Sequence, residues 1–293
     1  MLKAVGTKIL VGTLMFSLLL TGCAKKEEAK TPEGQQGAIA GSVQIKGSDT
    51  MVNLVQAWAE DFMDKNPDAS VAVTGGGSGT GIAALINGTT DIAMASREIK
   101  EKEVSDAKAK GIDVKETVVA LDGIAVVVNK DNPVDKLTLA QIKDIYTGKI
   151  NNWKEVGGPD LKIVVLSRES NSGTYAFFKE HVLNNENFRP DALLLPSTSA
   201  EVKEIQGNKG AIAYMGLGYV NETVKAVKVA KDASDAGLAP NLETVKSGEY
   251  PISRKLYLYS AGEPKGVGKA FIDYALSSDG QKTVEEMGFI PLK

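Results

Sequence analysis

Three segments of the chain place Ser, Thr and Gly residues directly after a run of β-branched residues. They are 47–50, 74–81 and 167–174, and each is followed by a helical pattern. Each therefore predicts a loop that ends a strand and opens a helix. The first amides of a helix lack intrahelical partners and lie at the positive end of its dipole, and hydroxyls add neutral donors. Three such loops predict a site for a small oxyanion.

The same residue types are also the preferred N-caps of helices, so each loop taken alone is explained as a cap. Two features favour a binding site over three separate caps. The triplet Ser-Gly-Thr occurs in the second and third loops, and the second loop contains three consecutive glycines, which let a ligand approach the backbone closely. Arg168 is the formal cation beside the third loop, so most of the expected donors are neutral.

Other phosphate- and nucleotide-binding motifs fit poorly. The Gly-x-x-x-x-Gly-Lys-Ser/Thr loop of nucleotide hydrolases is absent from the sequence. Gly79-x-Gly81-x-x-Ala84 matches the dinucleotide-binding pattern only loosely. We therefore expect no cofactor.

Hydrolytic chemistry also lacks its usual residues. No Gly-x-Ser-x-Gly elbow surrounds Ser78 or Ser172. The single His181 falls in a helical pattern and is expected to be a surface or packing residue rather than a general base. With one His and one Cys, the usual zinc ligands cannot be assembled, whereas a site made only of carboxylates stays open. We expect no enzymatic activity and no metal.

The elements that would position these loops alternate along the chain. Short β-branched runs predict strands at Val43–Lys46, Ser70–Thr74, Ile92–Ala95, Thr117–Leu121, Ile124–Asn129, Ile163–Leu166, Ala211–Tyr214 and Lys255–Tyr259. Between them lie helical patterns, of which Met51, Leu54, Trp58 and Phe62 form one amphipathic face. This alternation predicts an α/β protein with a mostly parallel sheet and helices on both faces.

The N-terminus resembles an export signal. Lys3 and Lys8 precede an apolar run that is too short to span a bilayer, and Leu20-Thr21-Gly22-Cys23 resembles a bacterial lipobox. We expect residues 1–22 to be removed, Cys23 to be acylated, and residues 23–40 to form a flexible tether. The remaining chain has a net charge of −5, which disfavours a nucleic-acid surface. The predicted location is the extracytoplasmic face of the cell membrane.

Several motifs in one order resemble the phosphate-binding proteins of bacterial phosphate ABC transporters. They include Gly47-Ser48-Asp49-Thr50-Met51, Gly75–Gly81, Asp91–Glu98, Ser170–Thr174, Asp122–Asn129, Ile145–Trp153 and Tyr250-Pro251-Ile252. The resemblance covers nearly all of 41–293. It implies a two-lobed type II periplasmic-binding-protein fold, with mixed sheets flanked by helices and the ligand in the cleft between the lobes. The expected first lobe is 41–126 with 250–293, and the expected second lobe is 127–249.

The resemblance also implies a function, partners and ligand-binding residues. The protein would bind inorganic phosphate with high affinity and deliver it to the membrane permease subunits of an ABC transporter, acting as a monomer. The residues carried over by motif are Ser48, Thr50, Met51, Ser78, Ser96, Arg168, Ser172, Gly173 and Thr174.

One position departs from the family pattern. Well-known members place Asp directly after the Ala-Ser of the 91–98 motif, where it accepts the phosphate proton, whereas this chain has Arg97. We expect Arg97 to add a charge-assisted contact to phosphate. The acceptor is then Asp122, Asp49 or Glu98. Asp122 is preferred because it directly precedes a predicted crossover strand, although a turn before Gly123 explains it equally well.

Other functions remain open on the sequence alone. Within the same class, the ligand could be sulfate, molybdate or tungstate. Outside it, an exported phosphatase is disfavoured by the lack of a nucleophile paired with a base. An adhesin or sensor that kept the fold is a third alternative.

Overall fold

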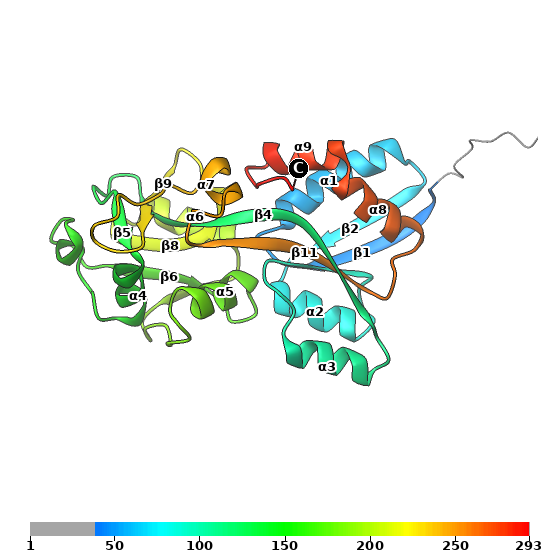
Figure 1. Ribbon diagram of the computed structural model, residues 1–293, viewed down its shortest axis with the longest axis horizontal. Coiled ribbons are helices and arrows are strands. Elements are labelled where there is room, and N and C mark those ends of the chain that lie inside the picture. Colours follow the sequence, from blue (N-terminus) through cyan, green and yellow to red (C-terminus); the bar gives the residue numbers. More distant parts are fainter. Residues whose placement is uncertain (1–38, 293) are drawn as a thin grey trace, which may run out of the picture. The chain divides into compact units, whose positions relative to one another are not determined.

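The computed structural model describes residues 39–292 (Figure 1). The predicted signal peptide, Cys23 and most of the tether lie outside the described residues. The strands are β1 (Gly41–Gly47), β2 (Ala69–Thr74), β3 (Ile92–Ala95), β4 (Val114–Asn129), β5 (Lys136–Thr138), β6 (Val164–Arg168), β7 (Leu193–Leu195), β8 (Ala211–Gly216), β9 (Val224–Ala226), β10 (Lys228–Ala230) and β11 (Ser253–Ala261). The helices are α1 (Val52–Lys65), α2 (Ser78–Ile86), α3 (Glu101–Ala109), α4 (Leu139–Thr147), η1 (Trp153–Val156), α5 (Gly173–His181), α6 (Thr198–Gly207), η2 (Leu217–Tyr219), α7 (Leu242–Lys246), α8 (Gly266–Leu276) and α9 (Ser278–Glu286).

The strands form one long mixed sheet in the order β2-β1-β3-β11-β4-β8-β6-β7, with β9 paired to β4 and a separate β10-β5 pair. The pairs β1–β2, β1–β3, β6–β7 and β6–β8 are parallel. The central strands β11 and β4 are antiparallel to their neighbours. The expectation of a mostly parallel sheet was therefore wrong at the centre, because these two strands connect halves of the sheet rather than belonging to one βαβ series.

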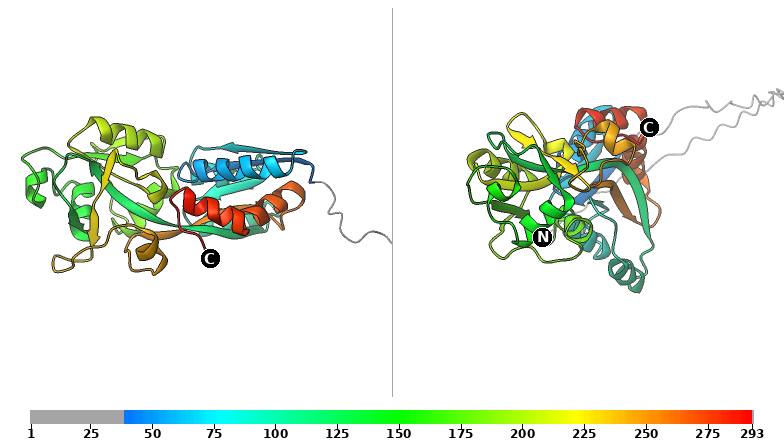
Figure 2. Two further views of the ribbon diagram at one scale, coloured as in Figure 1. Left: turned by 90° about the horizontal axis from the view of Figure 1, so that it is seen from above. Right: turned by 60° about the vertical axis from the view of Figure 1, so that its left-hand side comes forward.

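Strand β4 runs through both halves of the sheet (Figures 1 and 2). It pairs with β11 as far as Gly123 and with β8 from Ile124 onward. The sequence predicted two strands here, interrupted at Asp122-Gly123. The prediction was wrong because Gly123 is not in a positive-φ turn conformation but lies in an extended strand, packed beside Val245.

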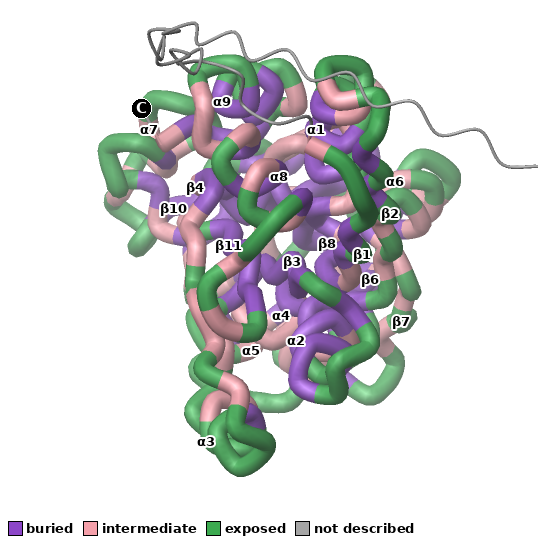
Figure 3. Tube along the Cα trace, turned by 90° about the vertical axis from the view of Figure 1, so that its right-hand side faces the viewer, coloured by how far each residue is buried: buried purple, intermediate pink, exposed green. Residues whose placement is uncertain are grey.

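The fold is two-lobed, with the change of partner along β4 between the lobes. In the first lobe, α1, α8 and α9 cover one face of the sheet, and α2 and α3 cover the other (Figure 1). The predicted apolar face of α1 is confirmed, since Leu54, Trp58 and Phe62 are almost fully buried in the core. The strands are buried between these layers, whereas α3 is mostly exposed (Figure 3).

The second lobe repeats the layered arrangement. Helices α4, α5 and α7 pack on one face of its strands, and α6 packs on the other. In the first of these layers Phe178 stacks on Tyr214, with ring centroids 3.9 Å apart. Tyr146 contacts both rings in an edge-to-face arrangement, at 4.8 and 5.5 Å. This aromatic contact fixes α5 against β8, and so places the loop that precedes α5 at the edge facing the first lobe. The precise lobe boundaries stay a prediction.

Candidate anion-binding site

The first two loops meet because β1, β2 and β3 are parallel, so their carboxyl ends lie at one edge of the sheet. Ser48 follows β1, Ser78 begins the helix after β2, and Ser96 follows β3. The Ser48 hydroxyl donates to Ser96 Oγ at 2.8 Å, and Ser78 Oγ lies 3.4 Å from Ser96 Oγ. The parallel pairing thus gathers three hydroxyls from segments up to 48 residues apart.

The loop of the second lobe closes onto the same point. Thr174 Oγ1 lies 2.8 Å from Thr50 Oγ1, across the lobes. A Cβ on Gly173 would lie only 2.2 Å from Ser78 Oγ, so a larger residue would not fit there. Five hydroxyls therefore share one buried position, each on a residue at most 1% exposed, and we call them the hydroxyl cluster: Ser48, Thr50, Ser78, Ser96 and Thr174.

The helix ends distinguish a binding site from ordinary capping. Ser172 does cap α5, because its Oγ accepts from the Tyr175 amide at 3.3 Å. Ser78 does not cap α2, since its Oγ instead accepts from the Ser96 amide at 3.1 Å. Helix α1 begins after Met51 and, among residues 39–292, has no side-chain cap either. Two of the three converging helix N-termini thus keep amides that no side chain caps, as an anion site requires.

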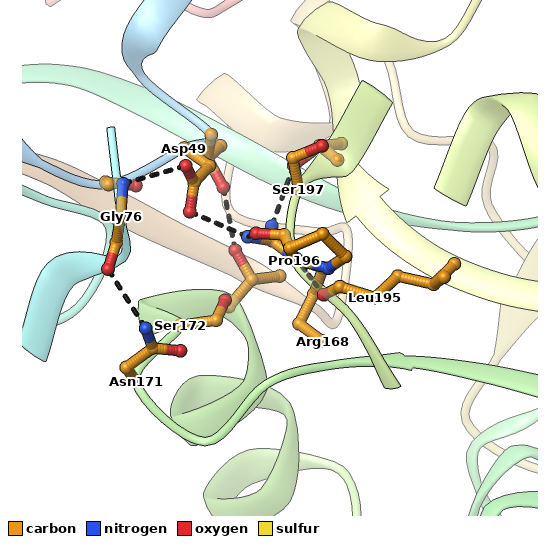
Figure 4. A network of polar contacts seen from close by, with 12 residues as sticks. Asp49, Gly76, Arg168, Asn171, Ser172, Leu195, Pro196 and Ser197 are labelled. Atoms are coloured by element: carbon orange, nitrogen blue, oxygen red, sulfur yellow. Dashed lines mark hydrogen bonds and ion pairs between the residues drawn. The ribbon is translucent and has the colours of Figure 1, made fainter. Parts of the chain in front are cut away.

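Arg168 lies beside the cluster at the end of β6, and its side chain is only 2% exposed. Its guanidinium donates to the carbonyl oxygens of Leu195 and Pro196 and to the Thr198 hydroxyl, all within 3.2 Å. It also pairs with Asp49 of the first lobe at 2.8 Å. Figure 4 shows these contacts converging on the guanidinium. The predicted cation is therefore at the site, with a carboxylate partner of its own.

Arg97 has its own partner at the end of β3. Its guanidinium makes two hydrogen bonds to the Glu103 carboxylate, at 2.7 and 2.8 Å, and a third to the Glu98 carbonyl. These bonds, with the backbone bond from Lys100, lower the pKa of Glu103 against the effect of its burial. The structure thus directs Arg97 toward α3, and its predicted contact with a ligand would require sharing this bidentate pair.

Asp122 is fully buried beneath the cluster. Its Oδ2 accepts two hydrogen bonds from Arg254, at 2.7 and 3.0 Å, and its Oδ1 accepts the Leu217 amide at 3.0 Å. Burial raises the pKa of Asp122, whereas the charge and hydrogen bonds of Arg254 act in the opposite direction. A carboxylate offers about four acceptor positions. The described residues use three of these positions at Asp122 and leave one unused.

Arg254 is the residue that the sequence did not predict. It lies directly opposite Asp122 in the β4–β11 register. Its Nη1 also donates to the Ser96 carbonyl at 2.8 Å and to the Thr174 hydroxyl at 3.1 Å, so one guanidinium contacts both lobes. The three arginines near the cluster are each paired with a carboxylate. An anion here would therefore be held largely by hydroxyls and helix dipoles.

The structure offers little for other chemistry. His181 is exposed and stacks on Phe177, with ring centroids 4.1 Å apart, as expected of a surface residue. Within residues 39–292, no three His, Cys, Asp or Glu side chains are grouped so as to hold a metal ion. Over the same residues, none of the helices combines the length and apolar character that crossing a membrane requires.

Comparison with known proteins agrees with this geometry. Residues 32–279 match the family model of the PBP superfamily domain. The phosphate-binding protein PstS of Bacillus subtilis is 37% identical over 94% of this chain and 91% of its own length. The chain belongs to the PstS family, within the PBP superfamily. PstS of Pseudomonas aeruginosa is 32% identical over 97% of the chain and 95% of its own length.

Solved structures extend the PstS-family likeness to the fold. An X-ray structure with bound phosphate, assigned to a phosphate ABC transporter substrate-binding protein of Clostridium perfringens, has a TM-score of 0.80 and 39% identity. It covers 86% of this chain and 100% of that one. An ABC-type phosphate transport receptor from Vibrio cholerae has a TM-score of 0.69 and 32% identity, over 85% and 99%. The predicted two-lobed type II fold is therefore confirmed.

Proposed function

We propose that the chain binds inorganic phosphate between its lobes and delivers it to the membrane permease subunits of an ABC transporter. The observation that carries this proposal is the hydroxyl cluster, five buried hydroxyls contributed by both lobes beside two helix N-termini without side-chain caps. Such a site binds an oxyanion through neutral donors. The names of the PstS relatives support phosphate as that oxyanion.

Each predicted ligand residue takes a place in this proposal. The cluster hydroxyls and the amides around Met51 and Gly173 donate to phosphate, with Ser172 and Arg168 at the edge. Arg254 belongs beside them, because its Nη1 already contacts Ser96 and Thr174. Arg97 is the weakest candidate, since Glu103 holds both of its terminal nitrogens.

Asp122 is the proposed acceptor of the phosphate proton. It is fully buried and has one acceptor position left, whereas Glu98 is exposed and accepts from the Tyr257 hydroxyl. Asp49 is 15% exposed at the rim of the site, where its two oxygens accept from Gly76 and Arg168. An acceptor of this kind favours protonated phosphate over sulfate, because sulfate has no proton to donate to the carboxylate and would place another negative charge beside it.

The setting of the site is proposed from the sequence. Residues 1–22 act as an export signal, acylated Cys23 anchors the protein at the extracytoplasmic face of the membrane, and residues 24–40 act as a tether. The folded part acts as a monomer and performs no catalysis. We propose lobe boundaries at 126/127 and 249/250, close to where β4 exchanges β11 for β8.

Equilibrium dialysis with radiolabelled phosphate, in the presence of competing anions, tests the function. We expect phosphate to bind at one site and excess sulfate or molybdate not to displace it. Displacement by either anion at equal concentration would assign the site to that anion. Turnover of a phosphate ester by the same preparation would support the phosphatase alternative instead.

The acceptor is tested with three variants in the same dialysis, Asp122→Asn, Asp49→Asn and Glu98→Gln. An amide can donate as well as accept, so the true acceptor variant should bind sulfate better relative to phosphate than the wild type does. We expect this change in Asp122→Asn. If it appears in Asp49→Asn or Glu98→Gln instead, the acceptor is reassigned while phosphate binding stands.

A further inference from the structure

Asp49 makes three contacts at the rim of the site, two of which join it to the other lobe; Figure 4 shows those with Gly76 and Arg168. Within its own lobe, its Oδ1 accepts the Gly76 amide at 3.0 Å. Across the cleft, its Oδ2 accepts from Arg168 Nη2 at 2.8 Å, and its carbonyl oxygen accepts the Tyr219 hydroxyl at 2.7 Å. The first lobe thus holds the carboxylate in place, and the cation that this carboxylate balances belongs to the second lobe.

Arg168 has a different set of partners inside its own lobe. Those contacts are the Leu195 and Pro196 carbonyl oxygens and the Thr198 hydroxyl, all of which are neutral. They hold the guanidinium in place without balancing its charge. Asp49 is the carboxylate that pairs with it, and Asp49 comes from the first lobe.

Another carboxyl group lies close to Arg168. It is that of Glu201, in helix α6 of the second lobe. It is fully buried, and neither of its oxygens has a hydrogen-bond partner among the described residues. Burial raises the pKa of Glu201 to about 8, although Arg168 acts to lower it. Burial thus favours the uncharged form of Glu201, and among the described residues its carboxyl makes no hydrogen bond to Arg168.

We propose that Asp49 is a positioning residue whose carboxylate balances the positive charge of Arg168 only when the lobes are closed. With the lobes apart, Arg168 is an unpaired cation fixed at the mouth of the second lobe. With the lobes together, Asp49 neutralises it and links the lobes. The inference rests on the proposed function, because phosphate is the anion that the exposed cation attracts.

Two kinetic consequences separate the roles of the two residues. A fixed, unpaired charge increases the association rate of an oppositely charged ligand, and this increase weakens with salt. A buried charge pair that forms after encounter instead slows dissociation. Arg168 should therefore influence both association and dissociation of phosphate, whereas Asp49 should influence dissociation alone.

Asp49→Asn is the matched perturbation, because the amide oxygen can still accept the Gly76 amide while the charge is lost. The full chain in detergent is loaded with radiolabelled phosphate, and its release into excess unlabelled phosphate is followed by rapid filtration. We expect dissociation at least about tenfold faster than in the wild type, and an association rate within about threefold. Arg168→Gln should slow association and reduce its salt dependence.

A double variant and a control complete the test. If the two residues act through one contact, Asp49→Asn/Arg168→Gln should dissociate no faster than Arg168→Gln alone. Asp91→Asn, which changes an aspartate that accepts the Gln44 amide in the first lobe, should dissociate at the wild-type rate. An unchanged dissociation rate in Asp49→Asn, or effects that multiply in the double variant, would overturn the inference.

Failure of the proposed function is distinguishable from failure of this inference. If the wild type binds no phosphate, the function falls, and the contact is then tested without ligand by small-angle X-ray scattering. A larger radius of gyration for Asp49→Asn than for the wild type would support the interlobe link. Equal radii would contradict it.

Discussion

Replacing Arg254 by Met removes the positive partner of a fully buried carboxylate. The Arg254 side chain is 2% exposed and that of Asp122 is 0% exposed, and two hydrogen bonds join them. Breaking such a pair by removing one partner typically costs about 3–5 kcal/mol, because an uncompensated charge stays buried. For a domain of this size, about 2–4 °C is lost per kcal/mol, so the melting temperature should fall by roughly 6–20 °C near pH 7.

The loss of stability in Arg254→Met should depend on pH, and the protonation of Asp122 determines whether it grows or shrinks as the pH rises. Burial already raises the pKa of Asp122, and the loss of Arg254 removes the influences that lower it. A folded-state pKa above the unfolded value of about 3.9 means that the folded protein binds more protons. The free energy of unfolding of the variant therefore falls as the pH rises above about 4, relative to the wild type. The variant should be closest to the wild type in acid.

Thermal unfolding followed by circular dichroism at pH 4.5 and pH 7.5, without phosphate, measures both effects. Asp122→Asn/Arg254→Met is the control, because its amide has no proton to bind in this range and its deficit should be independent of pH. An equal deficit of the single variant at both pH values would refute the reasoning. So would a deficit below about 1 kcal/mol at pH 7.5, since it would mean that solvent reaches the pair.

Three further predictions concern the site, the packing of α2 and the anchor. Ser78→Ala and Ser172→Ala should each weaken phosphate binding by about 1–3 kcal/mol, roughly 5- to 150-fold in Kd by calorimetry. Ser172→Ala should also lower the melting temperature because it removes a helix cap. Wild-type affinity in both variants would contradict the proposed phosphate site. Gly81→Ala would place a Cβ 2.3 Å from the Lys46 carbonyl oxygen, so it should destabilise the fold by about 1–3 kcal/mol, and an unchanged melting temperature would refute that packing. Cys23→Ala should abolish labelling by radioactive palmitate in cells, and persistent labelling would place the lipid elsewhere.

The sequence predicted those features that depend on local order along the chain. The apolar spacing of Leu54, Trp58 and Phe62 predicted the buried face of α1, and the Ser/Thr/Gly loops predicted where helices begin. The β-branched runs located the long strands. The short strands β5, β7, β9 and β10 were not predicted, since three residues carry too little periodicity to be recognised.

Features that depend on register and long-range pairing were not accessible. Arg254 meets Asp122, 132 residues away, only because of the register of β4 with β11. The sequence explained Asp122-Gly123 equally well as a turn, whereas the pairing of β4 on both sides of this point keeps the strand extended. Arg97 was predicted to contact the ligand from its motif position, whereas its pairing with Glu103, in the first turn of α3, was not predicted.

The most direct test of the central claim is a crystal structure of the protein grown with phosphate. We predict one phosphate enclosed by both lobes, with oxygens within hydrogen-bond distance of the Thr50, Ser78 and Thr174 hydroxyls and of the Gly173 amide. The hydroxyls that now bond to one another, Thr50 with Thr174 and Ser48 with Ser96, should turn toward it. Phosphate bound away from this cluster, or a cluster unchanged in saturating phosphate, would contradict the account.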